Sequence, residues 1–280
     1  MAPEARVGVA TGAARGMGLA CARRMVGTVD VLLAVDIDRD GAAGAAEELS
    51  QSSTRVEPVA LDVTDADAVR ALGEQIAGEG TLRAVAHAAG VSPTMADGET
   101  VLRVDLLGTA LLVDAFTPLV VPRTAMVCFA SMAGHMGAEG VAPDVDAALD
   151  APLADDFLQR VRTAAGGAAP DPGGAYGLAK RGVHRLVQRE AVTWGRRGGR
   201  INSVSPGIID TPMGRQEYDS QPIMKTLVEM TPLAREGLPD ELAAAVAFLL
   251  SDDASFVNGT DLLVDGGVVA AMRSGAAGPP

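Results

Sequence analysis

Residues 7–25 read VGVATGAARGMGLACARRM, a short β-branched run that leads directly into an alanine-rich segment with helical spacing. Gly12, Gly16 and Gly18 fall where the predicted strand turns into the predicted helix. Small residues at such a turn let backbone amides approach a pyrophosphate, whose negative charge is favoured by the N-terminus of the helix. The stretch therefore predicts a dinucleotide-binding strand–turn–helix unit and, with it, an α/β fold.

The strand predicted next, VLLAVD (31–36), ends in the acidic residue Asp36. An acidic side chain at this position can accept hydrogen bonds from both ribose hydroxyls of the adenosine half, and its charge repels a 2′-phosphate. The sequence therefore favours NAD over NADP as the cofactor. Arg15 opposes this preference, because a cation inside the glycine turn can reach a 2′-phosphate. The alternative for Asp36 is an ordinary solvated strand end.

Short apolar runs and alanine-rich helical segments alternate along the chain, a pattern typical of a parallel sheet covered on both faces. The sequence predicts a doubly wound parallel sheet of about seven strands in a single α/β domain, 1–273. The strands are expected at 7–11, 31–36, 56–62, 82–90, 125–131, 200–207 and 261–267. The helices are expected at 17–27, 40–51, 65–78, 98–117, 174–195 and 239–251.

Three segments fall outside this alternation. Residues 138–174 are longer than most loops of a compact domain, so they are expected to form an insertion with one short helix at 153–165. Residues 211–237 are rich in methionine and leucine, which suits a substrate lid over an apolar ligand and suits ordinary core packing equally well. The tail 274–280, made of small residues and prolines, is expected to be disordered.

The composition excludes several classes of function. A net charge of −13 repels polyanions, so neither nucleic acid nor an anionic membrane surface is an expected partner. The most apolar stretch, 104–121, carries two aspartates and a proline and fits a buried helix better than a membrane span. No secretory signal opens the chain, and Cys21 and Cys128 lie far apart in apolar stretches. The protein is therefore expected to be cytoplasmic, with both thiols buried and no metal site.

AYGLAKRG (175–182) holds one of the two tyrosines and one of the two lysines of the chain. Tyr176 and Lys180 are four residues apart, so on a helix they project from the same face. The ordinary pKa of a tyrosine is near 10. A neighbouring ammonium group favours the phenolate and would lower this pKa toward neutral pH. The pair is a candidate for proton transfer; the alternative is a helix that happens to carry both residues.

A series of motifs, taken in order, resembles the short-chain dehydrogenase/reductase family: TGAARGMG (11–18), LDV (61–63), HAAG (87–90), SMAG (131–134), YGLAK (176–180), NSVSPGIIDTPM (202–213) and GTDLLVDGG (259–267). The resemblance spans about residues 6–268. It implies that Tyr176 is the general acid or base, which moves a proton while a hydride passes between a nicotinamide and a substrate carbon. It also implies that Ser131 hydrogen-bonds the substrate oxygen and that Lys180 binds the nicotinamide ribose.

Two positions depart from the family pattern. Asp105 stands where the family usually has an asparagine whose backbone holds a water of the proton relay, and we count Asp105 among the candidate catalytic residues. A carboxylate there can pair with Lys180 and shift the pKa of the pair. In HAAG, His87 and Ala88 replace two asparagines, and His87 is expected to be a packed strand-end residue rather than a catalytic one.

By the same resemblance, Asp62 and Val63 would flank the adenine, and Ala89 and Gly90 would line the floor of the cofactor site. The complete set of expected cofactor-binding residues is Gly12, Arg15, Gly16, Met17, Gly18, Asp36, Asp62, Val63, Ala89, Gly90, Tyr176, Lys180, Pro206, Gly207, Ile209 and Thr211. Pro206, Gly207 and the Ile209 backbone would lie beside the nicotinamide. Thr211 would lie near its carboxamide or near the pyrophosphate.

The expected function is NAD-dependent hydride transfer on a secondary alcohol or ketone. The apolar segment 211–237 favours a bulky hydrophobic substrate such as a steroid, a terpenoid or an aryl ketone, and the resemblance implies a homodimer or homotetramer. Extended relatives are epimerases or dehydratases of nucleotide sugars, but they add a C-terminal substrate domain, which is not expected in a chain that runs only a little beyond residue 267. A non-catalytic dinucleotide sensor or scaffold is expected to lack the tyrosine or the lysine, and both are present.

Overall fold

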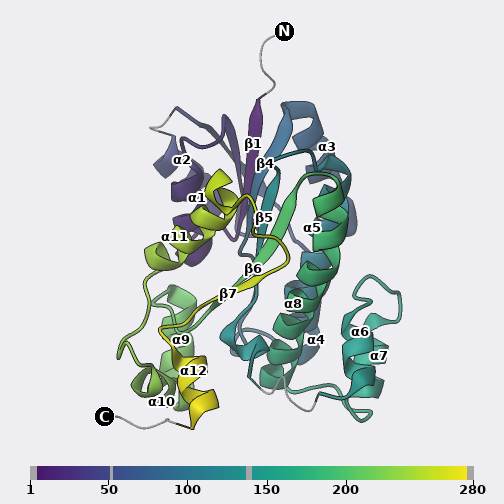
Figure 1. The fold of residues 1–280 in the computed structure, drawn as a ribbon, viewed down its shortest axis with the longest axis vertical. Coiled ribbons are helices and arrows are strands. Elements are labelled where there is room, and N and C mark those ends of the chain that lie inside the picture. Colours follow the sequence, from purple (N-terminus) through teal and green to yellow (C-terminus); the bar gives the residue numbers. More distant parts are fainter. Residues whose placement is uncertain (1–4, 51–52, 137–140, 276–280) are drawn as a thin grey trace.

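The computed structural model describes residues 5–50, 53–136 and 141–275. Seven strands form one sheet in the order β3-β2-β1-β4-β5-β6-β7, and every pair of neighbours is parallel (Figure 1). The strands are β1 (Arg6–Thr11), β2 (Val31–Asp36), β3 (Arg55–Ala60), β4 (Thr81–His87), β5 (Ala125–Phe129), β6 (Arg200–Pro206) and β7 (Asp261–Val264). The predicted doubly wound parallel sheet is confirmed.

Helices cover both faces of the sheet, as Figure 1 shows. One face carries α1 (Gly16–Met25), α2 (Arg39–Leu49) and α11 (Pro239–Leu250); the other carries α3 (Ala66–Glu79), α5 (Thr109–Phe116) and α8 (Pro172–Arg196). The side chains of β2 alternate between two buried clusters, because successive residues of a strand point to opposite faces. Leu32 and Ala34 belong to one cluster, and Leu33 and Val35 belong to the other. Both faces of β2 are therefore apolar along its buried length.

The helix predicted at 98–117 is not one regular helix. It begins as α4 (Gly98–Leu102), passes through a π-helical turn (Arg103–Gly108) and continues as α5. α4 packs on α8, whereas α5 packs on α3. The turn between them contains Asp105, which is one of the candidate catalytic residues. A π-helical turn inside an α-helix is uncommon and is frequently found at a functional site.

The described part of the insertion contains two helices where the sequence predicts one. α7 (Phe157–Ala164) is shorter than the helix expected at 153–165, and α6 (Pro143–Leu149) was not predicted. α6 begins with a proline at its first turn, a position that suits proline because its missing N–H would be unpaired there anyway. Residues 137–140, where the insertion begins, lie outside the described residues.

Ion pairs hold the insertion against α8. Asp146 of α6 accepts from Arg181 (2.7 Å) and Arg185 (3.1 Å), and Asp150 accepts from Arg185 (2.5 Å) and Arg189. Because the three arginines follow one another at intervals of four residues, they lie along one side of α8. Figure 1 shows α6 and α7 beside α8, away from the sheet.

The segment after β6 forms α9 (Pro212–Ser220) and α10 (Ile223–Met230), and the chain closes with α12 (Val268–Ser274). These three helices gather at the end of the molecule toward which the strands run (Figure 1). The described chain is helical as far as Ser274, the first residue of the expected tail, and residues 276–280 lie outside the described part.

Both cysteines are buried, as predicted, and burial raises the pKa of each thiol to about 12. They are therefore inert packing residues rather than nucleophiles. In the described part of the chain, none of the helices combines the length and the apolar character that a membrane crossing requires.

Candidate active site

A cleft of about 290 Å³ opens at the carboxyl ends of the central strands. The strand order turns between β1 and β4, which is where open α/β sheets bind their ligands. β4 ends at His87 and β5 at Phe129, earlier than the sequence predicts. Gly90 and Ser131 consequently lie in the loops beyond these strands, so loops rather than strands present them to the cleft.

The glycine turn adopts a backbone conformation that other residues rarely allow. Gly12 and Gly16 have φ angles of +66° and +58°, in the left-handed region. A Cβ atom at Gly18 would fall far inside van der Waals contact with the Gly12 carbonyl oxygen, so α1 can approach the turn only through a glycine. Among the described residues no side chain caps the N-terminus of α1, which leaves its first N–H groups available to an anion. The turn fits the pyrophosphate of a dinucleotide.

Asp36 lies beside this turn at the end of β2. Its Oδ2 accepts a hydrogen bond from the Ala14 N–H (3.0 Å), and its Oδ1 accepts one from the Asp38 N–H (3.0 Å). These bonds fix the carboxylate and leave each oxygen a further lone pair for a hydroxyl group. Asp36 is half-buried, whereas the Arg15 side chain is exposed. Of the two, the carboxylate is the group that the fold holds in place.

His87 is a structural residue, as the sequence predicts. The Thr109 hydroxyl donates to the Asp105 carbonyl oxygen (2.8 Å), so it must accept from His87 Nε2 (2.9 Å). His87 Nδ1 is then free to accept from the Thr11 hydroxyl (2.8 Å), which itself accepts from the Ala89 N–H (3.0 Å). Burial, with Lys180 nearby, lowers the pKa of His87 to about 3. The neutral ring therefore ties the ends of β1 and β4 to α5.

Tyr176, Lys180 and Ser131 meet in the cleft, and all three line it. Tyr176 and Lys180 lie one turn apart on the same face of α8, with Lys180 Nζ 5.4 Å from the centre of the tyrosine ring. Nζ donates to the Phe129 carbonyl oxygen (3.2 Å), which anchors it at the end of β5. The Ser131 hydroxyl accepts from the Ala133 N–H (3.1 Å). The predicted convergence of the three side chains is confirmed.

Asp105 reaches the same place from the π-helical turn and is fully buried. Its Oδ1 accepts from the Val91 N–H (2.9 Å), and its Oδ2 lies 3.6 Å from Lys180 Nζ. Burial raises the pKa of Asp105, and the ammonium group of Lys180 opposes the rise. The expected pairing with Lys180 is therefore present. Within the described chain Oδ2 has no hydrogen-bond partner, so it can accept from a further donor.

The pKa of Tyr176 is raised rather than lowered. Burial is the largest cause, the charges of Asp105 and Glu217 add to it, and a hydrogen bond with Ser131 works in the opposite direction. Burial therefore outweighs any lowering of this pKa by Lys180. The Asp105 carboxylate, 3.6 Å from the lysine Nζ, offsets the ammonium charge that would otherwise favour the phenolate.

Several expected cofactor residues line the cleft: Met17, Gly90, Pro206, Gly207, Ile209 and Thr211. Others lie around it and support its walls. Asp62 is exposed and accepts from the Thr64 N–H (2.8 Å), while Val63 is buried and packs closely on Gly108. The Ala89 N–H is already used by the Thr11 hydroxyl, so Ala89 can meet a ligand through its other atoms only.

The polar part of the cleft was not predicted from the sequence. Glu217 of α9 and Gln221, which follows that helix, both line the cleft. Burial raises the pKa of Glu217, and a hydrogen bond with Ser92 opposes the rise. The spacing of four residues between Glu217 and Gln221, inside a segment otherwise rich in methionine, is the signal that could have revealed them.

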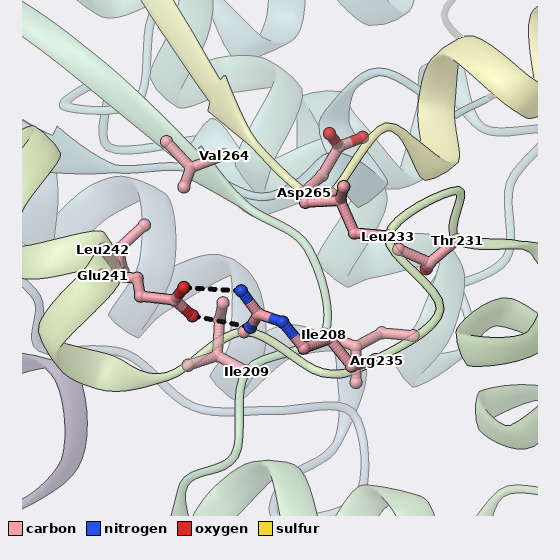
Figure 2. A pocket seen from close by; sticks show the side chains of 11 residues that line it. Ile208, Ile209, Thr231, Leu233, Arg235, Glu241, Leu242, Val264 and Asp265 are labelled. Atoms are coloured by element: carbon pink, nitrogen blue, oxygen red, sulfur yellow. Dashed lines mark hydrogen bonds and ion pairs between the residues drawn. The ribbon is translucent and has the colours of Figure 1, made fainter.

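A second hollow, of about 100 Å³, lies behind the loop that follows β6 (Figure 2). Ile208 and Ile209 line both hollows, so this loop is the wall between them. Figure 2 shows Arg235 pointing toward Glu241 of α11, with two hydrogen bonds of 2.8 and 2.6 Å joining them. This pair anchors the end of the segment 211–237 to the body of the protein.

Comparison with known proteins agrees with this geometry. A family model described as "short chain dehydrogenase" matches residues 6–143, and one described as "Enoyl-(Acyl carrier protein) reductase" matches residues 161–269. Short-chain dehydrogenase/reductase bsc3 of Alternaria brassicicola is 34% identical over 261 residues, covering 92% of this chain and 93% of that protein. The chain belongs to the short-chain dehydrogenase/reductase family. It is an oxidoreductase that acts on CH–OH groups and uses a nicotinamide cofactor.

Two further proteins match along most of the chain. D-threitol dehydrogenase of Mycolicibacterium smegmatis is 31% identical, covering 94% of this chain and 93% of that protein. The structure of a short-chain type dehydrogenase/reductase from Mycobacterium ulcerans superposes with a TM-score of 0.73 at 25% identity, covering 96% of this chain and 92% of that one. The described residues of α6 and α7 do not line this cleft.

Proposed function

We propose that the protein is an NAD-dependent oxidoreductase that interconverts a secondary alcohol and its ketone. One observation carries this proposal: Ser131, Tyr176 and Lys180 face a single cleft that begins at a glycine turn beside Asp36. A bound nicotinamide supplies the hydride or accepts it. The chain's own residues have to hold the substrate oxygen, move its proton and exclude water.

The roles follow from where each group lies. Ser131, whose oxygen is fixed by the Ala133 N–H, turns its own hydrogen toward the substrate oxygen. Tyr176 gives a proton to this oxygen in reduction and takes it in oxidation. Lys180, held by the Phe129 carbonyl oxygen, presents its remaining N–H groups to the nicotinamide ribose. Asp105 positions Lys180 and accepts from a further donor of the proton relay through Oδ2.

The remaining cofactor contacts are assigned by position. The glycine turn with Met17 holds the pyrophosphate, Asp36 the adenosine ribose, and Asp62 with Val63 the adenine. Pro206, Gly207, Ile209 and Thr211 line the cleft beside Tyr176 and face the nicotinamide. Ala89 and Gly90 form the floor: a Cβ at Gly90 would lie 2.8 Å from Asp105 Oδ1, so only a glycine leaves the floor open.

Asp36 decides the choice of cofactor, so the variant Asp36→Ala should lose the preference for NAD. A hydrogen bond to a charged group contributes about 1.5–3 kcal/mol, so kcat/KM for NAD should fall roughly 10- to 100-fold while that for NADP falls less or rises. Initial rates with both cofactors, followed at the NADH absorbance band, measure the ratio. Asp40→Ala removes an exposed carboxylate nearby and should leave the ratio unchanged. A wild-type preference for NADP would contradict the role given to Asp36.

The substrate is proposed to be largely apolar with one further polar group. Met132, Met136 and Met213 line the cleft together with Ile223, Met224 and Leu227, a surface that suits a bulky steroid, terpenoid or aryl body. Glu217 and Gln221 interrupt this surface, and a half-buried carboxylate needs a donor when a ligand excludes water. The relationship to D-threitol dehydrogenase, whose name describes a polyol substrate, supports a hydroxyl as that donor.

A substrate panel tests both parts of the proposal. Purified protein with NAD is supplied with hydroxysteroids, terpene alcohols, aryl alcohols and small polyols, and NADH formation is recorded. We expect the highest kcat/KM for a compound that joins an apolar body to a second hydroxyl. No turnover of any secondary alcohol or ketone, with either cofactor, would overturn the proposed reaction.

Glu217→Gln should reduce kcat/KM by roughly 10-fold or more for substrates that carry the second hydroxyl and leave purely apolar alcohols little affected. The amide keeps the size of the side chain but loses the charge that strengthens the hydrogen bond. Glu229→Gln, in α10 of the same segment, is the control because Glu229 does not line the cleft. An equal loss of kcat/KM for both classes of substrate would show that Glu217 does not bind the second hydroxyl.

Asp105→Asn should move the pH dependence of alcohol oxidation toward lower pH. Oxidation requires the phenolate of Tyr176, and after burial the Asp105 charge is the largest cause that raises the pKa of this tyrosine. Removing the charge lowers that pKa, so the acidic limb of kcat/KM shifts downward and the rate near pH 7 rises several-fold. Asp114→Asn, an exposed aspartate on α5, should not shift the limb. An acidic limb of kcat/KM that stays at the same pH or moves to higher pH in Asp105→Asn would contradict the coupling between Asp105 and Tyr176.

A further inference from the structure

Two of the three histidines of the chain, His135 and His184, contact the carboxylate of Asp261 close to the turn that begins at Ser131. His135 Nε2 lies 2.7 Å from Asp261 Oδ2, and His184 Nε2 lies 3.3 Å from Asp261 Oδ1. The two imidazole rings are 4.6 Å apart between centres. His135 follows the turn that begins at Ser131, His184 lies one turn beyond Lys180 on α8, and Asp261 is the first residue of β7.

The surroundings of this cluster are polar at positions where an apolar residue is expected. β6 is buried along its whole length, and such a strand normally reads as a continuous apolar run. Ser203 and Ser205 interrupt it on one face. The Ser203 hydroxyl donates to Asp261 Oδ1 (2.6 Å), and the Ser205 oxygen lies 2.8 Å from His184 Nε2. Oxygen and nitrogen atoms from four elements therefore converge on one point between the sheet and α8.

Asp261 has only imidazole and hydroxyl partners in the described part of the chain. The side chains of His135, His184 and Asp261 are 22%, 12% and 11% exposed, and the described chain pairs no lysine or arginine with Asp261. The Ser203 hydroxyl supplies the remaining contact. Two imidazole nitrogens and one carboxylate therefore face one another in a largely buried position.

We propose that His135, His184 and Asp261 bind a divalent cation of the zinc class. Two imidazole nitrogens and a carboxylate oxygen form a donor set that zinc prefers. The three ligand atoms all lie within 4.8 Å of one another. Bonds of about 2.0–2.2 Å in a tetrahedral site place ligand atoms roughly 3.4 Å apart, so the side chains need to adjust by less than about 1 Å.

Binding changes protonation and involves no redox step. His135 carries a proton on Nε2, because its carboxylate partner cannot donate. On cation binding this ring exchanges that proton with solvent for one on Nδ1, and the Nε2 lone pair of each imidazole serves as a ligand. The Ser205 hydroxyl or a water completes the fourth position.

The cation would hold segments of the protein in place and would take no part in the transfer of the hydride or the proton. It would join the turn behind Ser131, the part of α8 just beyond Lys180, and the start of β7. A Cβ at Gly134 would lie 2.8 Å from His184 Cε1 and 2.9 Å from the Lys180 carbonyl carbon, which shows how closely this turn already packs on the helix. The proposal is independent of which alcohol the enzyme oxidises.

The test is a calorimetric titration of the full chain, without an affinity tag and after chelator treatment, with Zn²⁺. We expect one Zn²⁺ per chain, with His184→Ala and His135→Gln each weakening the affinity by more than about 100-fold. His135→Gln is the sharper variant, because glutamine keeps an N–H donor for Asp261 but is a poor zinc ligand. Asp144→Asn, an exposed carboxylate in α6, should bind as the wild type does.

A wild-type protein that binds no Zn²⁺ overturns the site, and so does a His135→Gln variant that binds it with unchanged affinity. Circular dichroism establishes that each variant is folded. Should His184→Ala fail to fold, Co²⁺ added to the wild type decides, because tetrahedral ligation gives intense visible absorption bands. The bands should appear with one equivalent and be absent in His135→Gln, and their absence from the wild type would equally overturn the proposal.

Discussion

Tyr176→Phe is expected to lower kcat for alcohol oxidation by about 10²- to 10⁴-fold, the usual contribution of a positioned general acid or base. Phenylalanine keeps the ring that packs beside Lys180 and removes only the hydroxyl group that exchanges a proton with the substrate. Cofactor binding, followed by the fluorescence of NADH, should change little. The loss should therefore appear in kcat rather than in the affinity for the cofactor.

The chain offers a matched control for this variant. Tyr218 is its only other tyrosine and does not line the cleft. Tyr218→Phe should turn over at close to the wild-type rate, which separates the chemistry of Tyr176 from the general effect of removing a phenol. If Tyr176→Phe retains more than about a tenth of the wild-type kcat, the proton passes through another group and the proposed mechanism fails.

The variant with the next largest expected effect, Gly18→Ala, should destabilise the fold by about 1–3 kcal/mol or more and abolish cofactor saturation. The added methyl group would collide with the Gly12 carbonyl oxygen, and a backbone atom cannot move aside as a flexible side chain can. α1 would have to withdraw from the turn, which would carry its free N–H groups away from the pyrophosphate. Urea unfolding and NADH binding measure the two effects separately.

Gly44→Ala is the comparison for Gly18→Ala. Gly44 lies in the middle of α2, and a Cβ there meets no atom within 4 Å. The same substitution should stabilise the protein by roughly 0.5–1 kcal/mol, because alanine favours a helix interior more than glycine does. Equal stability changes in the two variants would show that the close approach at Gly18 does not determine the packing of α1.

Much of the fold could be predicted from the sequence, because the sheet depends on local patterns. Strands buried on both faces read as unbroken apolar runs, and VLLAVD was enough to place β2. Helix ends follow caps: Asp171 caps α8 by accepting from the Gly174 N–H (3.0 Å), so the helix begins two residues before its predicted start at 174. α6 was missed because a helix of seven residues is too short to show clear periodicity.

The site was less predictable wherever it depends on contacts between distant segments. The spacing of Tyr176 and Lys180 indicated that they share a face, but their charge environment depends on Asp105, which approaches from another helix. The sequence therefore suggested a lowered tyrosine pKa, whereas the structure raises it. For the same reason His135, His184 and Asp261 carry no recognisable spacing, because only the packing of α8 on the turn after Ser131 and on β6 brings them together.

The π-helical turn at 103–108 also limits which changes of length this helical segment can tolerate. Such a turn accommodates one residue more than an α-helical turn, and each residue of an α-helix advances the side-chain direction by about 100°. Removing one residue there would restore regular α-helical winding and rotate α5 against α4 by roughly that angle. α4 could then no longer pack on α8 while α5 packs on α3. The length of this segment is therefore fixed by the partners on both sides.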